Sequence, residues 1–356
     1  MNKNRNIIII VLILIVIAGV VIISKSRKGT FSKKDMDFAV EDTASVTKIF
    51  MADKKNRTLL LERQPNGKWK LNKKYKARPS GINMILETMN KLVPKAPVPK
   101  SAHNNIVAQL AAASVKVEVY QTVYRINLFD KIKLFPHEKL TKIYYVGSAT
   151  ADNMGTFMLM EGSDYPFIVH LLGFRGFVGP RYSIFEKDWR DHTVFRTKLA
   201  DIKSVIMEIP KDPQNSFRVD AAGDDFKLER LSDGSEVNGY DTLKLLNFMT
   251  AFADLRYESL MDEYVEPQKK DSIIHSLPQN IITLIDTKGD TTQVVTFARP
   301  NDNQAMDTKG NVYVADVDRL YALVNDKKDF VMLQYFVFDK VIRPLSYFKI
   351  DNKDKH

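Results

Sequence analysis

Two stretches of this chain carry the same succession of strand, hairpin and helix signals, at a spacing of roughly 155 to 165 residues. An alternating strand pattern at 47–51 recurs at 204–208, and an aromatic-Lys-Leu triplet at 69–71 recurs at 226–228. Because several short matches occur in one order, we predict an internal duplication. The chain is long enough for each copy to bury its own core.

A hairpin and a helix are predicted in each copy. Two strands flank a turn, at 65–67 in the first copy and at 222–224 in the second. Apolar residues then recur at three- and four-residue spacing, which is typical of an amphipathic helix. We expect these helices to begin near Ser80 and near Asn238, whose side chains are common helix caps.

A second set of matches follows each helix. The matched segments are, in order, 115–119 with 282–284, 155–159 with 310–314, and 166–173 with 320–324. The first two pairs are predicted strands, and we expect the apolar third pair to form a short helical segment. The strand connections are mostly short, which favours antiparallel pairing. The predicted fold class is therefore α+β, with two tandem repeats built on antiparallel sheets.

The N-terminal region contains an uninterrupted apolar run at 7–23. A helix of that length covers about 26 Å, close to the hydrocarbon thickness of a bilayer, so it predicts a transmembrane anchor at 7–24. A cleaved signal peptide is the alternative, but the run exceeds the usual apolar core of such peptides and no small-x-small cleavage site follows it. Because the chain has no cysteine, a lipid-modified N-terminus is excluded.

The orientation of this anchor has two interpretations. Lys3 and Arg5 precede the run and five basic residues follow it within 25–34, so a literal count of charges favours a cytoplasmic body. A short basic leader before a long C-terminal body is nevertheless the usual layout of a signal anchor. We expect the body to lie outside the cytoplasm. The predicted parts are a tail at 1–6, the anchor at 7–24, a linker at 25–44, repeats at 45–198 and 199–345, and a polar tail at 346–356.

Several short motifs suggest a family. They are an Asn-Gly-Lys-Trp-Lys-Leu stretch at 66–71, Pro-Ser at 79–80, Tyr-Tyr-Val-Gly at 144–147, and Trp-Arg-Asp at 189–191 ahead of Phe195. Across most of 45–265 the chain resembles bacterial envelope proteins of unknown function that have one N-terminal span and a repeated α+β body. Members are often encoded beside ABC-transport components of the gliding-motility auxiliary type. The resemblance implies a single-pass inner-membrane protein with a periplasmic body, in an accessory or assembly role beside ABC transporter subunits.

The sequence offers no catalytic, cofactor-binding or metal-binding constellation. Nucleophile-elbow, zinc-protease, phosphate-loop and dinucleotide motifs do not occur, and the six histidines lack metal-ligand spacing. The net charge of +10 can attract nucleic acid or anionic lipid. A membrane-tethered chain meets lipid first, and no nucleic-acid-binding signature occurs, so we predict no nucleic-acid partner. The main hypothesis is a non-enzymatic accessory module.

Two surface features are candidate binding sites. The first is a Gly- and Arg-rich loop, where backbone amides and guanidinium groups can meet an anion or a partner; its residues are Gly173, Arg175, Gly176, Gly179, Arg181 and Tyr182. The alternative is a structural loop that Phe174 and Phe177 pin to the core. The second is a basic hairpin at 54–78, whose lipid-facing candidates are Lys68, Lys70, Lys73 and Lys74.

The hairpin that matches the basic one, at 212–241, is acidic and can face a partner; the alternative is that both are solvated faces. Two other functions remain open. A ligand or glycan sensor predicts an aromatic pocket near Phe174, Phe177 and Tyr182. A hydrolase predicts carboxylates, such as Glu186, Asp188 and Asp191, in a cleft between the repeats.

Overall fold

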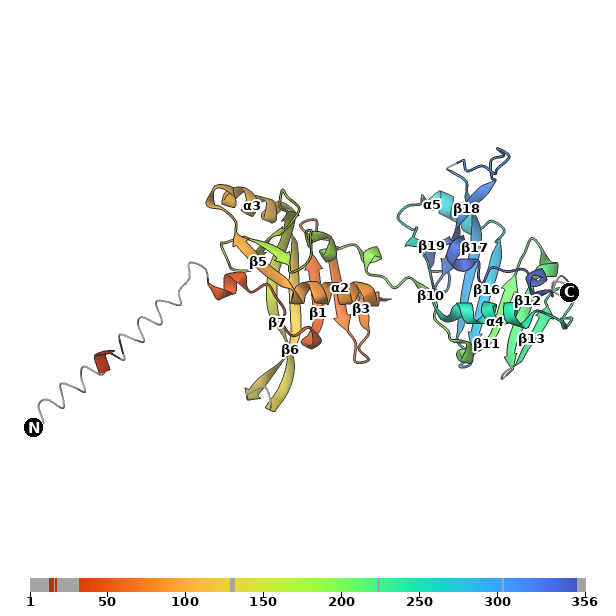
Figure 1. The fold of residues 1–356 in the computed structure, drawn as a ribbon, viewed down its shortest axis with the longest axis horizontal. Helices are drawn as coiled ribbons and strands as arrows, with labels where there is room; N and C mark the ends of the chain where they lie inside the picture. Colours follow the sequence, from red (N-terminus) through yellow and green to blue (C-terminus); the bar gives the residue numbers. More distant parts are fainter. Residues whose placement is uncertain are drawn as a thin grey trace, which may run out of the picture. The chain divides into compact units, whose positions relative to one another are not determined.

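The structure is a computed structural model. It describes residues 13–15, 17, 32–128, 132–222, 225–302 and 304–350. The chain divides into two compact units, at 1–191 (unit 1) and 192–356 (unit 2), and each is described by itself. Each unit contains one large antiparallel sheet with helices packed on it (Figure 1). The predicted α+β class with antiparallel sheets is confirmed.

Unit 1 contains a nine-stranded sheet in the order β4-β3-β2-β1-β6-β7-β8-β9-β5. Its strands are β1 (Val46–Ala52), β2 (Thr58–Arg63), β3 (Trp69–Leu71), β4 (Tyr75–Lys76), β5 (Leu92–Pro97), β6 (Val115–Leu128), β7 (Ile132–Ala149), β8 (Thr156–Met160) and β9 (Phe167–Leu171). Its helices are η1 (Lys33–Met36), η2 (Thr43–Ser45), α2 (Pro79–Asn90), α3 (Lys100–Ala113), η3 (Gly179–Tyr182) and η4 (Glu186–Asp188).

Unit 2 contains an eight-stranded sheet in the order β13-β12-β11-β16-β17-β18-β19-β15, and a small sheet of β10 and β14. Its strands are β10 (Thr193–Phe195), β11 (Ile202–Glu208), β12 (Phe217–Ala222), β13 (Asp225–Arg230), β14 (Leu255–Arg256), β15 (Ser259–Leu260), β16 (Asn280–Asp286), β17 (Thr291–Pro300), β18 (Ala315–Val324) and β19 (Asp329–Gln334). Its helices are η5 (Leu199–Asp201), η6 (Pro213–Asn215), α4 (Thr242–Thr250), η7 (Ala251–Ala253), α5 (Pro267–Ile274), α6 (Tyr335–Phe338) and η8 (Leu345–Phe348).

The two large sheets have the same strand order once β4 is set aside. β1 occupies the place that β11 occupies in unit 2, and the next strand is β6 in one sheet and β16 in the other. The helices follow the same succession, because α2 and α4 each follow the first hairpin and α3 and α5 each precede the next long strand. The segments matched at 47–51 and 204–208 lie in β1 and β11, and those at 69–71 and 226–228 lie in β3 and β13.

The segments matched at 115–119 and 282–284 lie in the corresponding strands β6 and β16, but the last two matches are displaced. Residues 156–160 form β8, whereas 310–314 precede β18, the strand in the corresponding place. The expected short helical segments are wrong, because 167–171 form β9 and 320–324 lie in β18. Both faces of β18 are covered at 320–324, so its apolar residues are consecutive and show no alternation.

The main core of each unit lies between the sheet and one helix. In unit 1, α2 buries Ile82, Ile85 and Met89 against strands β1, β2 and β6. In unit 2, α4 buries Leu245, Phe248 and Met249 in the same way. The expected caps differ: Ser80 lies inside α2, and Asp241 rather than Asn238 caps α4 by accepting from the Lys244 amide at 3.0 Å.

Helices α3 and α5 were not predicted. Each covers a smaller apolar cluster on the second face of its sheet. Helix α3 contributes its own Ile106 and Leu110 to one cluster, and Ile273 and Ile274 of α5 pack against the other cluster. Few apolar residues are needed to cover such a small cluster. The helical periodicity in these segments is therefore weak.

The folded units extend beyond the boundaries expected from the sequence. Phe38 and Val40, expected in the linker, are fully buried in unit 1. Unit 2 begins at His192 rather than at 199, because β10 pairs with β14. It also includes Phe348, whose ring packs 5.2 Å from that of Phe217.

The anchor expected at 7–24 lies outside the described residues, apart from the helical positions 13–15 and 17. Within the described part of the chain, no helix is both long enough and apolar enough to cross a membrane. The tail at 1–6 and the residues from 351 onward also lie outside the described part. The anchor stays a prediction.

Candidate interaction surfaces

The Gly- and Arg-rich loop of unit 1 is partly core and partly surface. Tyr182 is buried, and its hydroxyl lies 3.1 Å from that of Tyr144. Val178 is also buried, and its amide donates to the Thr156 hydroxyl at 2.8 Å. Burial raises the pKa of Tyr144 and Tyr182 above the usual range for a phenol. This half of the loop belongs to the packing of unit 1, and Tyr182 does not line a surface pocket.

The remainder of the loop is exposed and partly fixed. The Arg181 guanidinium donates to the Thr88 hydroxyl at 3.0 Å and lies 4.5 Å from the centre of the Phe174 ring. Gly176 has a φ of +152°, and a Cβ there would lie 2.9 Å from the Phe174 ring. Arg175 and Phe177 are exposed beside them. The loop therefore offers one exposed cation and two aromatic edges.

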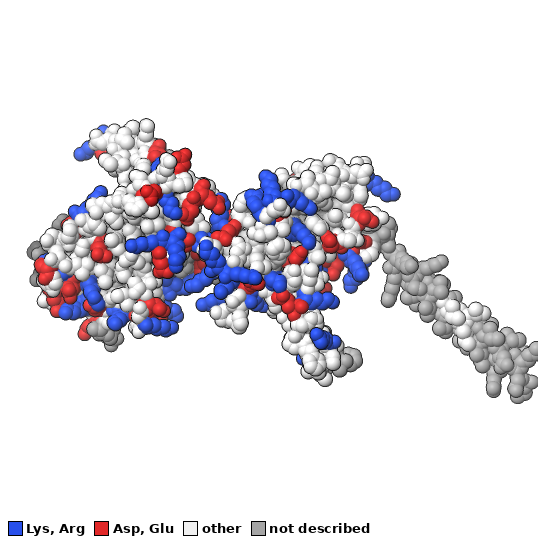
Figure 2. Space-filling view, turned by 180° about the vertical axis from the view of Figure 1, so that it is seen from behind, with Lys and Arg blue, Asp and Glu red and all other residues white. Residues whose placement is uncertain are grey.

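The four lysines of the basic hairpin are exposed but do not form one patch. Lys68 follows the turn between β2 and β3, whereas Lys73 and Lys74 lie in the turn at the opposite end of β3. Lys70 lies between them on the outer face, paired across the sheet with Glu62. Figure 2, seen from behind, shows Lys and Arg side chains over unit 1 interleaved with acidic ones. The set therefore extends over both ends and the outer face of β3.

The carboxylates near the end of unit 1 have structural partners. Glu186 accepts from the Asn72 amide at 2.9 Å, and Asp188 accepts from the Ser183 hydroxyl. Trp189, which follows them, is buried, and its ring NH donates to the Ser183 carbonyl at 2.7 Å. These contacts fix the last turn of unit 1 against β3 and β4.

The resolved pKa shifts of the carboxyl groups all have the same direction. Each described carboxyl group with a resolved pKa shift is lowered, as at Asp53, Glu118 and Asp316. Burial raises the pKa of Asp316, but the amides of Asp318 and Arg319 and the Arg299 guanidinium outweigh it. Among the described residues, no group of three or more potential ligands could hold a metal ion.

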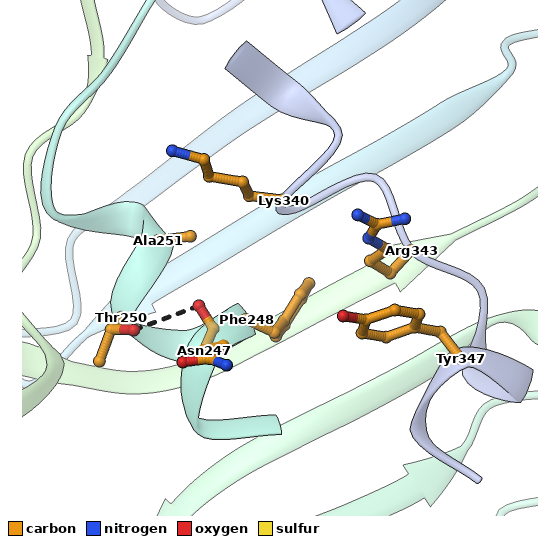
Figure 3. Close-up of a pocket in the computed structure, with 7 residues that line it drawn as sticks. All are labelled: Asn247, Phe248, Thr250, Ala251, Lys340, Arg343 and Tyr347. Atoms are coloured by element: carbon orange, nitrogen blue, oxygen red, sulfur yellow. Dashed lines mark hydrogen bonds between the residues drawn. The ribbon is translucent and has the colours of Figure 1, made fainter. Parts of the chain in front are cut away.

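Unit 2 contains a pocket that the sequence did not indicate. Its volume is about 360 Å³, and it is lined by Asn247, Phe248, Thr250, Ala251, Lys340, Arg343 and Tyr347. Figure 3 shows Arg343 beside the Tyr347 ring, with its guanidinium 4.5 Å from the ring centre. Arg343 also pairs with Asp339 at 2.7 Å. The lining comes from α4 and the start of η7, and from the segment after α6, so no local motif could reveal it.

Two long hairpins are the other features that the sequence did not indicate. In unit 1, β6 and β7 continue past the rest of the sheet (Figure 1). We define the arm as residues 122–127 of β6 and 132–140 of β7. It carries exposed apolar side chains, including Ile132 and Leu134, which are 51% and 46% exposed. Alternating apolar residues at 122–134 are its only sequence signal.

In unit 2, the connection between β17 and β18 is also long, and we define the extension as residues 304–314. Met306 and Val312 pair across it, and Val314 is 99% exposed. The Asn301 side chain donates to the carbonyls of Ala305 and Tyr313 at 2.9 and 3.0 Å. Asp307 closes the tip by accepting from the amides of Lys309 and Asn311, both at 2.8 Å. The extension is thus ordered by its own hydrogen bonds.

Comparisons of the chain with protein-family models, with curated proteins and with solved structures find no match.

Proposed function

We propose that this protein is a non-enzymatic accessory or assembly module of the bacterial envelope. In this proposal residues 7–24 anchor it in the inner membrane, the body lies in the periplasm, and the units are tandem copies of one repeat. It holds an envelope protein partner, such as a subunit of an ABC-type transporter. The sequence resemblance and the apolar run support the location. The extension of unit 2 supports the binding role.

The observation that carries the proposal is a difference between two otherwise corresponding sheets. Unit 1 joins β7 to β8 through a short turn, in which the Thr150 amide donates to the Gly155 carbonyl at 2.9 Å. Unit 2 places the extension at the corresponding connection. The shared scaffold closes without it, so the added residues have another use. Loops held on a rigid scaffold are common recognition elements.

The chemistry of the extension favours a protein partner. Met306, Val312 and Val314 are each more than half exposed, which leaves an apolar cluster in water on an ordered loop. Because Asn301 and Asp307 already fix the backbone, binding would cost little ordering entropy. A partner with an apolar groove could bury these side chains.

The test is affinity purification of the full-length protein from its native membrane in mild detergent, with mass spectrometry of the recovered proteins. We expect stoichiometric recovery of envelope-machine subunits, and loss of them in Val314→Asp. Leu277→Asp is the matched control, because Leu277 is an exposed apolar residue of unit 2 outside the extension. Recovery of the wild-type protein alone would contradict the proposal. If Val314→Asp recovers the same subunits as the wild type, the extension is not the binding element.

The pocket of unit 2 favours ligand sensing as the second candidate. Its volume lies within the range of small-molecule sites, and Arg343 and Lys340 suit a ligand with a carboxylate or phosphate group. A binding ligand at about one hundred times its Kd would stabilise unit 2 by about 2.7 kcal/mol. We expect phosphorylated sugars to raise the melting temperature of the wild-type protein but not of Arg343→Gln, with Arg256→Gln as control. A rise in both variants would place the ligand elsewhere.

A further inference from the structure

The arm of unit 1 is longer than the shared scaffold requires. β6 and β7 have 14 and 18 residues, whereas the corresponding β16 and β17 have 7 and 10. In unit 2 a tight turn joins these strands, with Asp286 accepting from the amides of Lys288 and Asp290. The sheet can therefore close without an arm. The additional residues have a role outside the core.

The arm is a two-stranded ribbon that extends beyond the pairing of β6 with β1 and of β7 with β8. β1 stops pairing with β6 at Val46 and Gln121, and β8 begins pairing with β7 only at Tyr144. A two-stranded hairpin alone is marginally stable in water and gains stability when its apolar face is covered. The arm therefore has the character of a binding element.

The register of the arm gives it one apolar face and one mixed face. Ile126 lies opposite Leu134, and Tyr124 lies opposite Pro136, so these side chains share a face that Ile132 continues. The opposite face carries Arg125, Asn127, Lys133, His137 and the exposed Phe135 ring. The Lys133 ammonium lies 5.7 Å from the centre of the Tyr124 ring, so a cation also borders the apolar face.

The charge on the arm is positive. Arg125, Lys133 and Lys139 are exposed, whereas Glu138 is paired with Lys48 at 2.5 Å and accepts from the Thr47 hydroxyl at 2.7 Å. An apolar face bordered by cations complements a bilayer surface, where acyl chains lie beneath anionic phosphates. A second copy of the chain would present the same cations and repel them.

The N-terminal segment enters unit 1 at the base of the arm. The Gln121 amide donates to the Asp42 carbonyl at 3.0 Å and to the Ser45 hydroxyl at 2.8 Å, and Lys142 pairs with Asp37 at 2.7 Å. Only 25–31 separate this segment from the expected anchor, a span of at most about 25 Å. The arm extends about 23 Å beyond Gln121. A tether of this length allows the expected anchor and the arm to contact the same membrane surface.

We propose that the arm docks on the anionic phospholipid surface of the membrane, with Tyr124, Ile126, Ile132 and Leu134 facing the acyl chains. Arg125, Lys133 and Lys139 contact the phosphates. This inference rests on the proposed anchoring and specifies how unit 1 faces the bilayer. Lys68 lies at the same end of the sheet, because Arg63 at the end of β2 donates to the Thr43 carbonyl at 3.1 Å. Lys73 and Lys74 lie in the turn at the other end of β3.

The test uses the full-length protein, which contains no cysteine and can be labelled at single introduced positions. An environment-sensitive fluorophore is placed at Ile132→Cys or Leu134→Cys, with Thr291→Cys as an exposed control and Ile15→Cys as a report on the anchor. Vesicles contain phosphatidylcholine with or without phosphatidylglycerol. We expect emission from the arm to rise about twofold with phosphatidylglycerol, and to be quenched by spin-labelled lipid, because the label enters the headgroup boundary.

A pair of charge variants gives a second readout. Lys133→Glu with Lys139→Glu should abolish the dependence on phosphatidylglycerol, whereas Lys73→Glu with Lys74→Glu should preserve it. All four positions are exposed, so we expect unchanged melting temperatures. Equal behaviour of the two variants would overturn the proposal.

The remaining outcomes separate the inference from the proposed function. If the anchor label is quenched and the arm labels match Thr291→Cys, the anchoring stands and the arm proposal fails. If the anchor label stays in water, the proposed anchoring fails. Arm labels that still enter the vesicle surface would then support docking of the arm, whereas arm labels that stay in water would overturn both the anchoring and the docking. Energy transfer between arm labels of two copies would show that a second chain covers the arm, which also overturns it.

Discussion

Two tyrosines that the sequence did not connect meet in the core of unit 1. Their rings are perpendicular with centroids 6.0 Å apart, and the two hydroxyls satisfy each other away from water. Tyr182 was expected in a surface loop because its neighbours are glycine and arginine. That local signal does not show that η3 returns the chain to the sheet, which is a consequence of tertiary packing.

Removing both hydroxyls should cost less than the two single removals added together. Tyr182→Phe leaves the Tyr144 hydroxyl buried without this partner, so we expect a loss of about 1 to 3 kcal/mol in the free energy of unfolding. The double variant with Tyr144→Phe should lose less than the sum of the two single changes. Urea denaturation followed by a signal from unit 1 measures this coupling. Strictly additive losses would contradict it.

The same pair predicts a dependence on pH. The pKa of both phenols is raised in the folded state, so their contribution is complete below the unfolded pKa of about 10 and is lost as the pH rises through the folded values. The double phenylalanine variant should lose less stability above about pH 10.

At the scale of elements, alternation and turn chemistry gave reliable predictions where one face of a strand is buried. The strands β1, β3, β11 and β13 lie where their patterns indicated. Failures occurred where a segment is covered on both faces, as in β18, or where a helix covers only a small cluster, as in α3. Leu243 also belongs to the apolar residues of α4 but is 66% exposed, because the face of α4 that packs on the sheet carries Leu245, Phe248 and Met249.

The extension of unit 2 has a clamp at its base that should respond to acid. Asp316 pairs with Arg299, and its carboxylate also accepts from the amides of Asp318 and Arg319 at 2.8 and 2.9 Å. Because its pKa is lowered in the folded state, the stabilisation is present above the unfolded pKa of about 4 and is lost as the pH falls through the folded value.

We therefore expect Asp316→Asn to loosen the extension at neutral pH. Amide hydrogen exchange at 304–314 should accelerate about tenfold, corresponding to about 1.4 kcal/mol of local opening. Exchange in β11 should not change, which makes that strand the internal control. Unaltered exchange in the extension would show that Asn301 and Asp307 suffice to hold it.

At the scale of the whole molecule, each unit has its own main core and satellite cluster, and the large clusters share no residues. The repeated order of signals predicted two similar units. The sequence could not indicate the different use of their hairpins, because the arm and the extension lie in connections that the repeat pattern skips. The pocket was equally hidden, since its two contributing segments are far apart in the chain.

Separate cores predict separate unfolding transitions. Phe248→Ala should destabilise unit 2 by about 3 to 5 kcal/mol and leave the transition of unit 1 in place, and Ile85→Ala should do the reverse at about 2 to 5 kcal/mol. Calorimetry of the full-length protein resolves the two. Leu243→Ala is the matched control on α4, because this side chain is exposed. A single transition that moves with every variant would show one cooperative unit.

The place of β5 in unit 1 has a consequence for biogenesis. This strand follows α2 in the chain, yet its only neighbour in the sheet is β9, which begins roughly 70 residues later. At typical rates of synthesis, β5 spends about 4 to 15 s without its partner as the chain emerges. During this interval its backbone is open to pairing with other emerging chains. Correct folding of unit 1 therefore depends on how the nascent segment is kept apart until β9 arrives.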